Sequence, residues 1–134
     1  SAEFSDHGDL VIHYMPGQSQ EISKGGSMRL GAYHCHLKPG SLAHNIYGKE
    51  EISERHRHRL EFNNAYKDKL EQMGLVFSGI NKELNLVEVI ELNHHPFFIA
   101  GQFHPEFMSR PFRPHPLFRE FISQAYQYQT QGTK

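Results

Sequence analysis

The sequence has little cysteine, little net charge and no long apolar run. Its single cysteine, Cys35, cannot form an internal disulfide, which is typical of a reducing cytoplasm, where we expect this protein. No apolar stretch approaches the roughly 20 residues of a membrane-spanning helix, and the first residues lack the basic and apolar segments of a signal peptide. The net charge of −1 gives no general attraction to nucleic acid or to anionic lipid.

The length and the first residues set the expected organisation. A chain of 134 residues has the size of one ordinary domain with a single core. It begins with Ser1-Ala2-Glu3-Phe4 rather than with an initiator methionine. We therefore expect a processed or trimmed piece of a longer product.

Hydrophobic periodicity and turn residues predict more strands than helices. The predicted strands are 10–15, 28–37, 55–62, 75–80, 86–92 and 97–103, the fourth and fifth forming a hairpin. The predicted helices are 41–47, capped by Ser41, 65–73, ended by Gly74, and 117–128, before a polar tail from about residue 129. The expected inward faces are Leu70 and Met73 on the second helix, and Leu117, Phe118, Phe121, Ile122 and Ala125 on the third. Only one clear helix lies between the late strands, so we expect part of an α/β or α+β sheet whose remaining strands lie elsewhere.

A histidine and a glutamate lie two residues apart in His104-Pro105-Glu106, shortly after the apolar run 97–100. Side chains two residues apart point the same way as a strand ends. The Glu106 carboxylate can therefore hold one ring nitrogen of His104 while the other nitrogen faces a nucleophile. This pattern predicts two members of a catalytic triad. The alternative is a surface histidine near a carboxylate, which is common at strand ends.

The chain offers no convincing nucleophile for this pair. Cys35 is the only thiol, and an activated cysteine usually lies at a helix N-terminus or on a tight glycine-flanked turn. No glycine elbow follows Cys35, so we interpret it as structural. Gly25-Gly26-Ser27 lacks the Lys-Ser/Thr pair and the helix of a phosphate-binding loop, and is interpreted as a flexible approach to a strand.

A basic run, Arg55-His56-Arg57-His58-Arg59, is the second distinctive pattern. In a strand it would place the arginines on one face and the histidines on the other. Eleven histidines in the chain invite a metal hypothesis, but the flanking arginines would repel a cation. Nucleic-acid binding is disfavoured because Glu50, Glu51, Glu54 and Glu61 surround the run and cancel its field. We favour an arginine that binds a carboxylate through two hydrogen bonds, the alternative being a strand neutralised by its acidic neighbours.

Several blocks together resemble one family across nearly the whole chain. The blocks, in family order, are residues 25–31 (Gly-Gly-Ser-Met-Arg-Leu-Gly), 54–61 (Glu-Arg-His-Arg-His-Arg-Leu-Glu), 95–98 (His-Pro-Phe-Phe), 102–107 (Gln-Phe-His-Pro-Glu-Phe) and 109–111 (Ser-Arg-Pro). They resemble the C-terminal part of the class I glutamine amidotransferase domain of CTP synthases. The Met-Arg-Leu-Gly and Arg-His-Arg-His-Arg blocks are the most specific, and Glu3-Phe4 resembles a short segment of the same family.

The resemblance implies a fold and a set of site residues. The fold would be α/β, the C-terminal half of a class I amidotransferase sheet with flanking helices, incomplete without the upstream half-domain. Residues 1–134 would all belong to that domain. His104 resembles the triad base and Glu106 its orienting carboxylate. Glu3 and Arg59 match positions that hold the α-amino group and the α-carboxylate of L-glutamine, which leaves Arg55 and Arg57 for packing or domain contacts.

The resemblance also implies partners outside this sequence. The family nucleophile is a cysteine in the upstream half of the domain. Whole CTP synthases carry a synthetase domain that binds ATP, UTP and Mg²⁺, and they are homo-oligomers, expected here to be tetramers. The segment itself would need no cofactor and no metal, bind neither nucleic acid nor membrane, and be inactive alone. An alternative is a non-catalytic binding or regulatory remnant that has lost its nucleophile.

Overall fold

The computed structural model describes residues 1–5, 7–14 and 28–131. The predicted loop at 17–27, including Gly25-Gly26-Ser27, lies outside the described residues.

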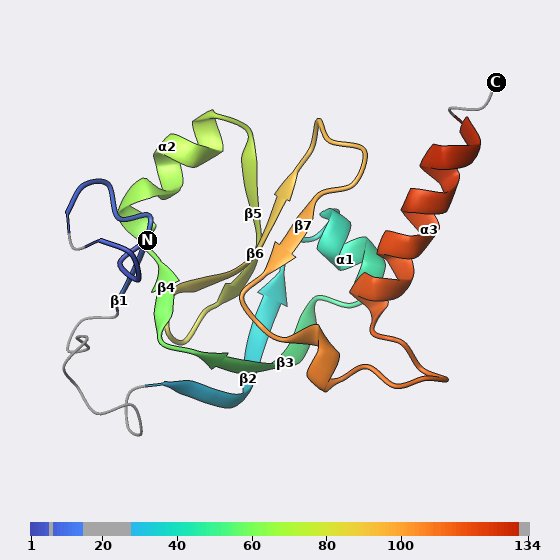
Figure 1. The fold of residues 1–134 in the computed structure, drawn as a ribbon, viewed down its shortest axis with the longest axis horizontal. Helices are drawn as coiled ribbons and strands as arrows, with labels where there is room; N and C mark the ends of the chain where they lie inside the picture. The colour runs from blue at the N-terminus through green and yellow to red at the C-terminus, as the bar shows by residue number, and fades with distance from the viewer. Residues whose placement is uncertain (6, 15–27, 132–134) are drawn as a thin grey trace.

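A five-stranded antiparallel sheet forms the centre of the fold (Figure 1). Its strand order is β3-β2-β5-β6-β7, and each neighbouring pair is antiparallel. The strands are β2 (Arg29–Leu37), β3 (Glu51–His58), β5 (Leu75–Asn81), β6 (Leu86–Leu92) and β7 (Ile99–Gly101). A separate two-stranded sheet pairs β1 (Ile12–Tyr14) with β4 (Leu60–Phe62). The predicted hairpin between the fourth and fifth strands is confirmed by the β5–β6 pairing.

Helices flank the sheet. They are α1 (Leu42–Tyr47), η1 (Asn64–Tyr66), α2 (Lys67–Gln72), η2 (Pro105–Phe107) and α3 (Pro116–Gln131). The predicted cap of the first helix is confirmed, because the Ser41 hydroxyl accepts a hydrogen bond from the His44 amide. Gly74, predicted to end the second helix, has a φ of 96°, a left-handed conformation that costs glycine least.

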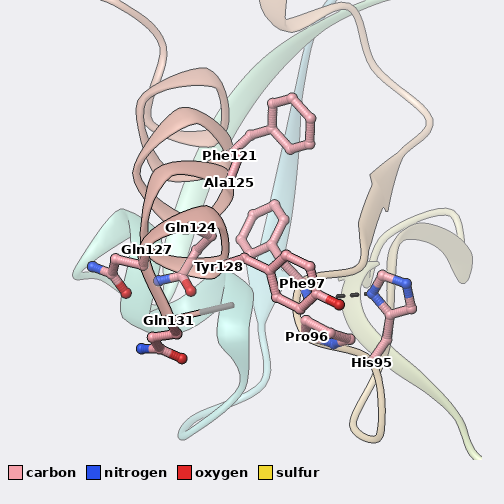
Figure 2. Close-up of a pocket in the computed structure, with 9 residues that line it drawn as sticks. All are labelled: His95, Pro96, Phe97, Phe121, Gln124, Ala125, Gln127, Tyr128 and Gln131. Atoms are coloured by element: carbon pink, nitrogen blue, oxygen red, sulfur yellow. Dashed lines mark hydrogen bonds between the residues drawn. The ribbon is translucent and has the colours of Figure 1, made fainter. Parts of the chain in front are cut away.

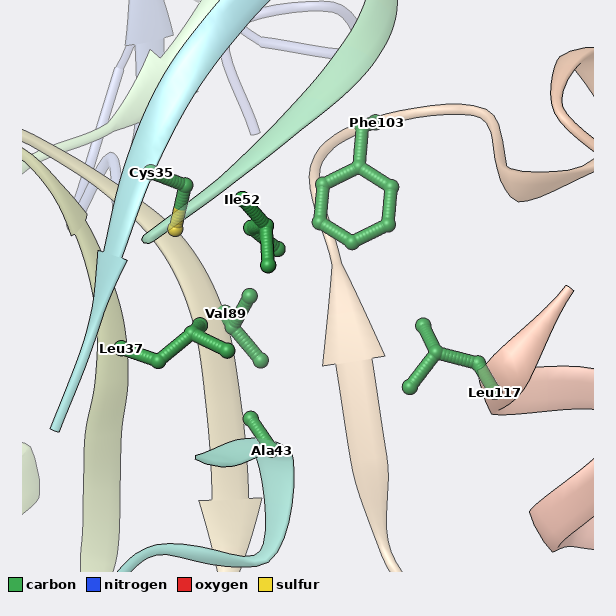
Figure 3. Close-up of a cluster of buried hydrophobic side chains, with 7 residues drawn as sticks. All are labelled: Cys35, Leu37, Ala43, Ile52, Val89, Phe103 and Leu117. Atoms are coloured by element: carbon green, nitrogen blue, oxygen red, sulfur yellow. The ribbon is translucent and has the colours of Figure 1, made fainter. Parts of the chain in front are cut away.

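Two apolar clusters form the core. One lies between the sheet and the first and last helices (Figure 3), and its buried members are Cys35, Leu37, Ala43, Ile52, Val89, Phe103 and Leu117. The other joins β4, β5 and β6, with Phe62, Phe77 and Val87 buried and α2 packed against them through Leu70. Figure 1 accordingly shows α1 and α3 on one side of the strands and α2 on the other.

The predicted strand 55–62 is wrong in its extent. It begins earlier, at Glu51, and ends at His58, while Leu60 starts β4 in the other sheet. The early part, residues 51–54, escaped prediction because one of its two inward positions is the polar Glu54, 4% exposed, so this part shows no apolar alternation.

The predicted strand 97–103 is also too long, since only Ile99–Gly101 is paired. After β7 the chain turns back on itself: a Cβ atom at Gly101 would lie 2.9 Å from Cζ of the Phe103 ring. Glycine at position 101 therefore lets Phe103 fold into the core and ends the strand.

The predicted inward faces of two helices are largely wrong. On α3 only Leu117 is buried, whereas Phe118, Phe121 and Ile122 are 40%, 56% and 65% exposed and Ala125 is exposed as well. On the second helix Met73 is 74% exposed, although Leu70 packs against the core. Periodicity identifies an apolar face, but it does not show that another element covers that face.

Candidate active site

His104 and Glu106 lie together at η2, the short 3-10 helix that follows β7, with His104 as its N-cap. The Nδ1 atom of His104 is 2.7 Å from Oε1 of Glu106. Since a carboxylate oxygen only accepts, Nδ1 carries the proton, and Nε2 is the nitrogen left for another group. The same hydrogen bond lowers the pKa of Glu106, which keeps this carboxyl group ionised. The geometry is that of a histidine base oriented by an acid.

Backbone contacts fix the segment that carries this pair. The His104 amide donates to the Arg55 carbonyl on β3 at 2.9 Å, and the Gln102 amide donates to the Glu88 carbonyl on β6 at 2.8 Å. Phe103, between them, is 4% exposed in the core. The ring of His104 stacks on Phe107, with centroids 4.9 Å apart and planes 18° from parallel. Two strands and a buried ring thus hold the imidazole in place.

Glu3 and Arg59 line one pocket of about 480 Å³, a typical size for a small-ligand site. The pocket lies where β3, β4, β1 and the first residues meet, and its lining residues are Ser1, Glu3, Ile12, Met28, Arg57, His58, Arg59, Leu60 and Gln102. It presents a carboxylate and two guanidinium groups, which suit the amino and carboxylate groups of an α-amino acid. Gln102, two residues before His104 in the sequence, lines this pocket, whereas His104 and Glu106 themselves do not.

The arginines of the basic run occupy different places. Arg55 and Arg57 are exposed on β3, opposite the buried His56, as the predicted alternation requires. Arg59 follows the end of that strand, and its guanidinium carbon lies 5.6 Å from the centroid of the Tyr14 ring. Arg57 lines the same pocket as Arg59.

A buried ionic cluster supports the wall of the pocket. Arg29 places Nη1 3.2 Å from Oε1 of Glu61 and Nη2 2.7 Å from Oε1 of Glu88. Both carboxylate side chains are fully buried. One guanidinium cannot balance two buried carboxylates. Burial accordingly raises the pKa of Glu61 to about 7 and also raises the pKa of Glu88.

Two histidines extend this cluster to the pocket. Burial and the nearby Arg29 lower the pKa of His56 to about 3 and that of His58 to about 4, so both rings are neutral at pH 7. His58 Nδ1 lies 3.0 Å from the Leu60 carbonyl, which only accepts, so this nitrogen carries the proton. His58 Nε2 is then the acceptor of the 2.8 Å contact with His56 Nδ1.

The raised pKa of Glu61 predicts a pH-dependent contribution to stability. Between pH 4.5, the ordinary pKa of a glutamate, and about 7, folded Glu61 binds more protons than unfolded Glu61. The contribution of Glu61 to the free energy of unfolding should therefore fall as pH rises through this window, by up to about 3 kcal/mol. His56 and His58, whose pKa values are lowered, contribute with the opposite sign below about pH 6.5, so the test compares a Glu61 variant with the parent. Glu61→Gln should remove this contribution. From urea unfolding at pH 5 and pH 8, the free energy of unfolding of the variant should therefore increase relative to that of the parent as the pH is raised. Glu83→Gln, at an exposed glutamate, is the matched control, and equal pH dependence in Glu61→Gln and the parent would contradict the prediction.

Cys35 lies in an environment unsuited to nucleophilic catalysis. Its side chain belongs to the core cluster, and the residue is 1% exposed. Burial, with the nearby Glu88 and Glu54, raises the pKa of its thiol to about 12. Its interpretation as structural agrees with this placement.

A second pocket of about 470 Å³ lies between α3 and the 95–97 turn (Figure 2). Aromatic and glutamine side chains dominate its lining, including Phe97, Phe121 and Gln124. His95 also lines it, and the Nδ1 atom of this ring accepts a hydrogen bond from the Phe97 amide at 3.2 Å. It therefore lacks the carboxylate and the guanidinium groups of the first pocket.

Within residues 1–5, 7–14 and 28–131, no group of three or more His, Cys, Asp or Glu side chains could hold a metal ion. No helix in the same ranges has the length and apolar character needed to cross a membrane.

Sequence reasoning missed several residues around the site. Arg29 and Glu88, which hold the buried cluster, and Gln102, which lines the pocket, were not singled out. The signal for Glu88 was present, because a charge inside the apolar run 86–92 requires a buried partner. No local pattern could name that partner, since Arg29 lies 59 residues away in sequence.

Comparison with known proteins agrees with these features. The chain is 57% identical over 129 residues to a CTP synthase of Symbiobacterium thermophilum, covering 96% of this chain and 24% of that protein. It is 58% identical over 123 residues to a CTP synthase of Carboxydothermus hydrogenoformans, covering 91% and 23%. The chain thus spans about a quarter of the length of these relatives, and the predicted resemblance to CTP synthases is confirmed.

A solved structure and a family model extend the agreement. The glutaminase domain of Trypanosoma brucei CTPS with bound acivicin superposes with a TM-score of 0.79 and 34% identity, over 87% of this chain and 46% of that one. The predicted α/β amidotransferase fold is therefore confirmed. The model of the family "Glutamine amidotransferase class-I" matches residues 7–124. The chain belongs to the class I glutamine amidotransferases.

Proposed function

We propose that this chain supplies the base and part of the substrate pocket of a glutaminase site within a CTP synthase. The observation that best supports this proposal is the 2.7 Å contact between His104 and Glu106. The same segment of the chain contributes Gln102 to the pocket that Glu3 and Arg59 line. The site would hydrolyse L-glutamine to glutamate and ammonia. The nucleophile would be a cysteine thiolate from the upstream half of the domain.

His104 would act through Nε2, the nitrogen not held by Glu106. After the thiolate attacks the glutamine carboxamide, protonated Nε2 would give its proton to the departing nitrogen, releasing ammonia and leaving a thioester. The neutral Nε2 would then take a proton from water, whose oxygen attacks the thioester carbonyl to release glutamate and the thiolate. Glu106 would fix the imidazole tautomer and stabilise its charged form throughout.

Glu3 and Arg59 would recognise the amino-acid end of glutamine. The Glu3 carboxylate would accept hydrogen bonds from the α-ammonium group, and the Arg59 fork would donate two to the α-carboxylate. Both side chains reach the same pocket, and the opposite charges they carry match those two groups.

The ammonia would be used elsewhere in the whole protein, for the ATP-dependent amination of UTP to CTP. This proposal is supported by the similarity to CTP synthases, which are about four times as long as the segment that matches this chain. ATP and Mg²⁺ would be bound by the synthetase domain, outside this chain. The whole protein would be a cytoplasmic homo-oligomer, expected to be a tetramer.

The proposal is tested by placing this chain in a CTP synthase, in exchange for the matching segment of the Symbiobacterium thermophilum protein. CTP formation is then measured with glutamine and, separately, with added ammonia. Activity from both nitrogen sources supports the proposed role. Activity from ammonia alone would identify the chain as a non-catalytic remnant.

Arg59→Ala in this protein should raise the KM for glutamine by roughly ten- to hundredfold. A charge-assisted hydrogen-bonded pair contributes about 1.5–3 kcal/mol, and 1.4 kcal/mol is about a factor of ten. Ammonia-dependent CTP formation should be unchanged, because ammonia bypasses the glutamine pocket. Steady-state kinetics with glutamine as the varied substrate measure the effect.

Two further variants control this experiment. Arg59→Lys should restore little, because a point charge cannot reproduce the planar two-bond geometry. Arg55→Ala removes an exposed arginine of β3 that does not line the pocket, and should leave the KM near the parent value. An unchanged KM in Arg59→Ala would remove Arg59 from the site.

A further inference from the structure

Arg59 stands at a bend between two sheets. His58 is the last residue of β3, which pairs with β2 at Arg29, and Leu60 is the first of β4, which pairs with β1 at Tyr14. A single residue therefore carries the chain from one sheet to the other. The direction of the Arg59 side chain depends on how the backbone leaves this bend.

One carbonyl at the bend accepts two side-chain hydrogen bonds. The Leu60 oxygen lies 3.0 Å from His58 Nδ1 and 3.2 Å from Gln102 Nε2. A carbonyl oxygen has two lone pairs and only accepts, so both side chains donate and the orientation of the Gln102 amide follows. The bend is thereby held from its own strand by His58 and from outside by Gln102.

Gln102 belongs to the segment that carries the histidine base. Its backbone amide is fixed to the Glu88 carbonyl at 2.8 Å, and His104 follows two residues later, fixed to the Arg55 carbonyl at 2.9 Å. The hydrogen bond from the Gln102 side chain to the Leu60 carbonyl thus connects the segment that carries His104 to the bend at Arg59. Both Gln102 and Leu60 line the pocket.

We propose that Gln102 is a positioning residue that sets the place of Arg59 relative to His104 by its hydrogen bond to the Leu60 carbonyl. In the glutaminase site proposed above, on which this inference rests, the α-carboxylate of glutamine must be held at a fixed distance from the carboxamide that reacts. Gln102 fixes the arginine to the segment that bears the base. Its loss lets the bend shift and weakens glutamine binding without touching the reacting atoms.

The test is Gln102→Met in the CTP synthase that carries this chain. Methionine has a similar length and no branch, but it cannot donate a hydrogen bond. Loss of one such bond should raise the KM for glutamine by roughly five- to tenfold. Ammonia-dependent CTP formation should stay at the parent rate. Gln102→Glu, which keeps the shape but presents oxygen to oxygen, should act in the same direction if the methionine variant folds poorly.

A matched control removes a similar bond away from the pocket. Asn64 donates its side-chain amide to the Asn85 carbonyl at 2.7 Å, and Asn64→Ala should leave the KM for glutamine at the parent value. An unchanged KM in both Gln102 variants would overturn the inference. So would an equal loss of glutamine- and ammonia-dependent activity, because that is the signature of a merely structural residue.

The same measurements separate this inference from the function on which it rests. A parent protein that forms CTP from ammonia but not from glutamine overturns the proposed function, and the role of Gln102 falls with it. A parent active with glutamine, whose KM does not respond to position 102, overturns the role of Gln102 alone.

Discussion

His104→Ala should abolish glutamine-dependent CTP formation in a CTP synthase that carries this chain, while synthesis from added ammonia continues. The imidazole would give the proton to the departing ammonia and take one from the attacking water, so its loss stops both halves of the glutaminase reaction. Loss of one triad member costs on the order of 10⁴-fold or more in rate. Added ammonia bypasses this chemistry and enters at the synthetase site.

The ammonia reaction is the internal control of this prediction, and His94→Ala is the external one. His94 is an exposed histidine in the turn between β6 and β7, and its loss should leave both activities unchanged. Equal loss of both activities in His104→Ala would mean that His104 holds the structure and not the chemistry. Its hydrogen bond to Glu106 would then be a surface ion pair near a strand end, the alternative that the sequence alone leaves open.

Features set by neighbouring residues were predictable from the sequence. The Ser41 cap and the β5–β6 hairpin follow from turn residues and periodicity within a few positions, and both are present. The contact between His104 and Glu106 was predicted from their spacing at a strand end, but the structure forms it at the 3-10 helix η2, which His104 precedes and which contains Glu106. Such features need no knowledge of distant parts of the chain.

Features set by distant residues were not predictable. The end of β3 at His58 depends on pairing with β2, and β4 departs because it pairs with β1, more than 45 residues earlier. The exposed face of α3 depends on which elements pack against it, and only its first turn reaches the core, through Leu117. The pocket residues Glu3 and Arg59 were found by resemblance to a family, because no local pattern joins residues so far apart in sequence.

The purified 134-residue chain should release no ammonia from glutamine at an enzymatic rate. Its only thiol is that of Cys35, whose side chain points from β2 into the core and which is 1% exposed. Burial raises the pKa of this thiol to about 12. Without a thiolate, no acyl-enzyme forms, and the base and pocket have no reaction to assist. The measurement is ammonia release from glutamine by the chain alone, compared with the same chain in a whole CTP synthase.

Cys35→Ala makes this prediction decisive. The variant should behave as the parent does, inactive alone, and should retain glutamine-dependent CTP formation when it is part of the whole protein, apart from the cost of a small cavity in the core. Ammonia release by the isolated parent that disappears in Cys35→Ala would show that the buried thiol reaches the solvent and reacts. Release that persists in Cys35→Ala would point to a nucleophile other than a thiol, and would contradict the need for a second segment to complete the site.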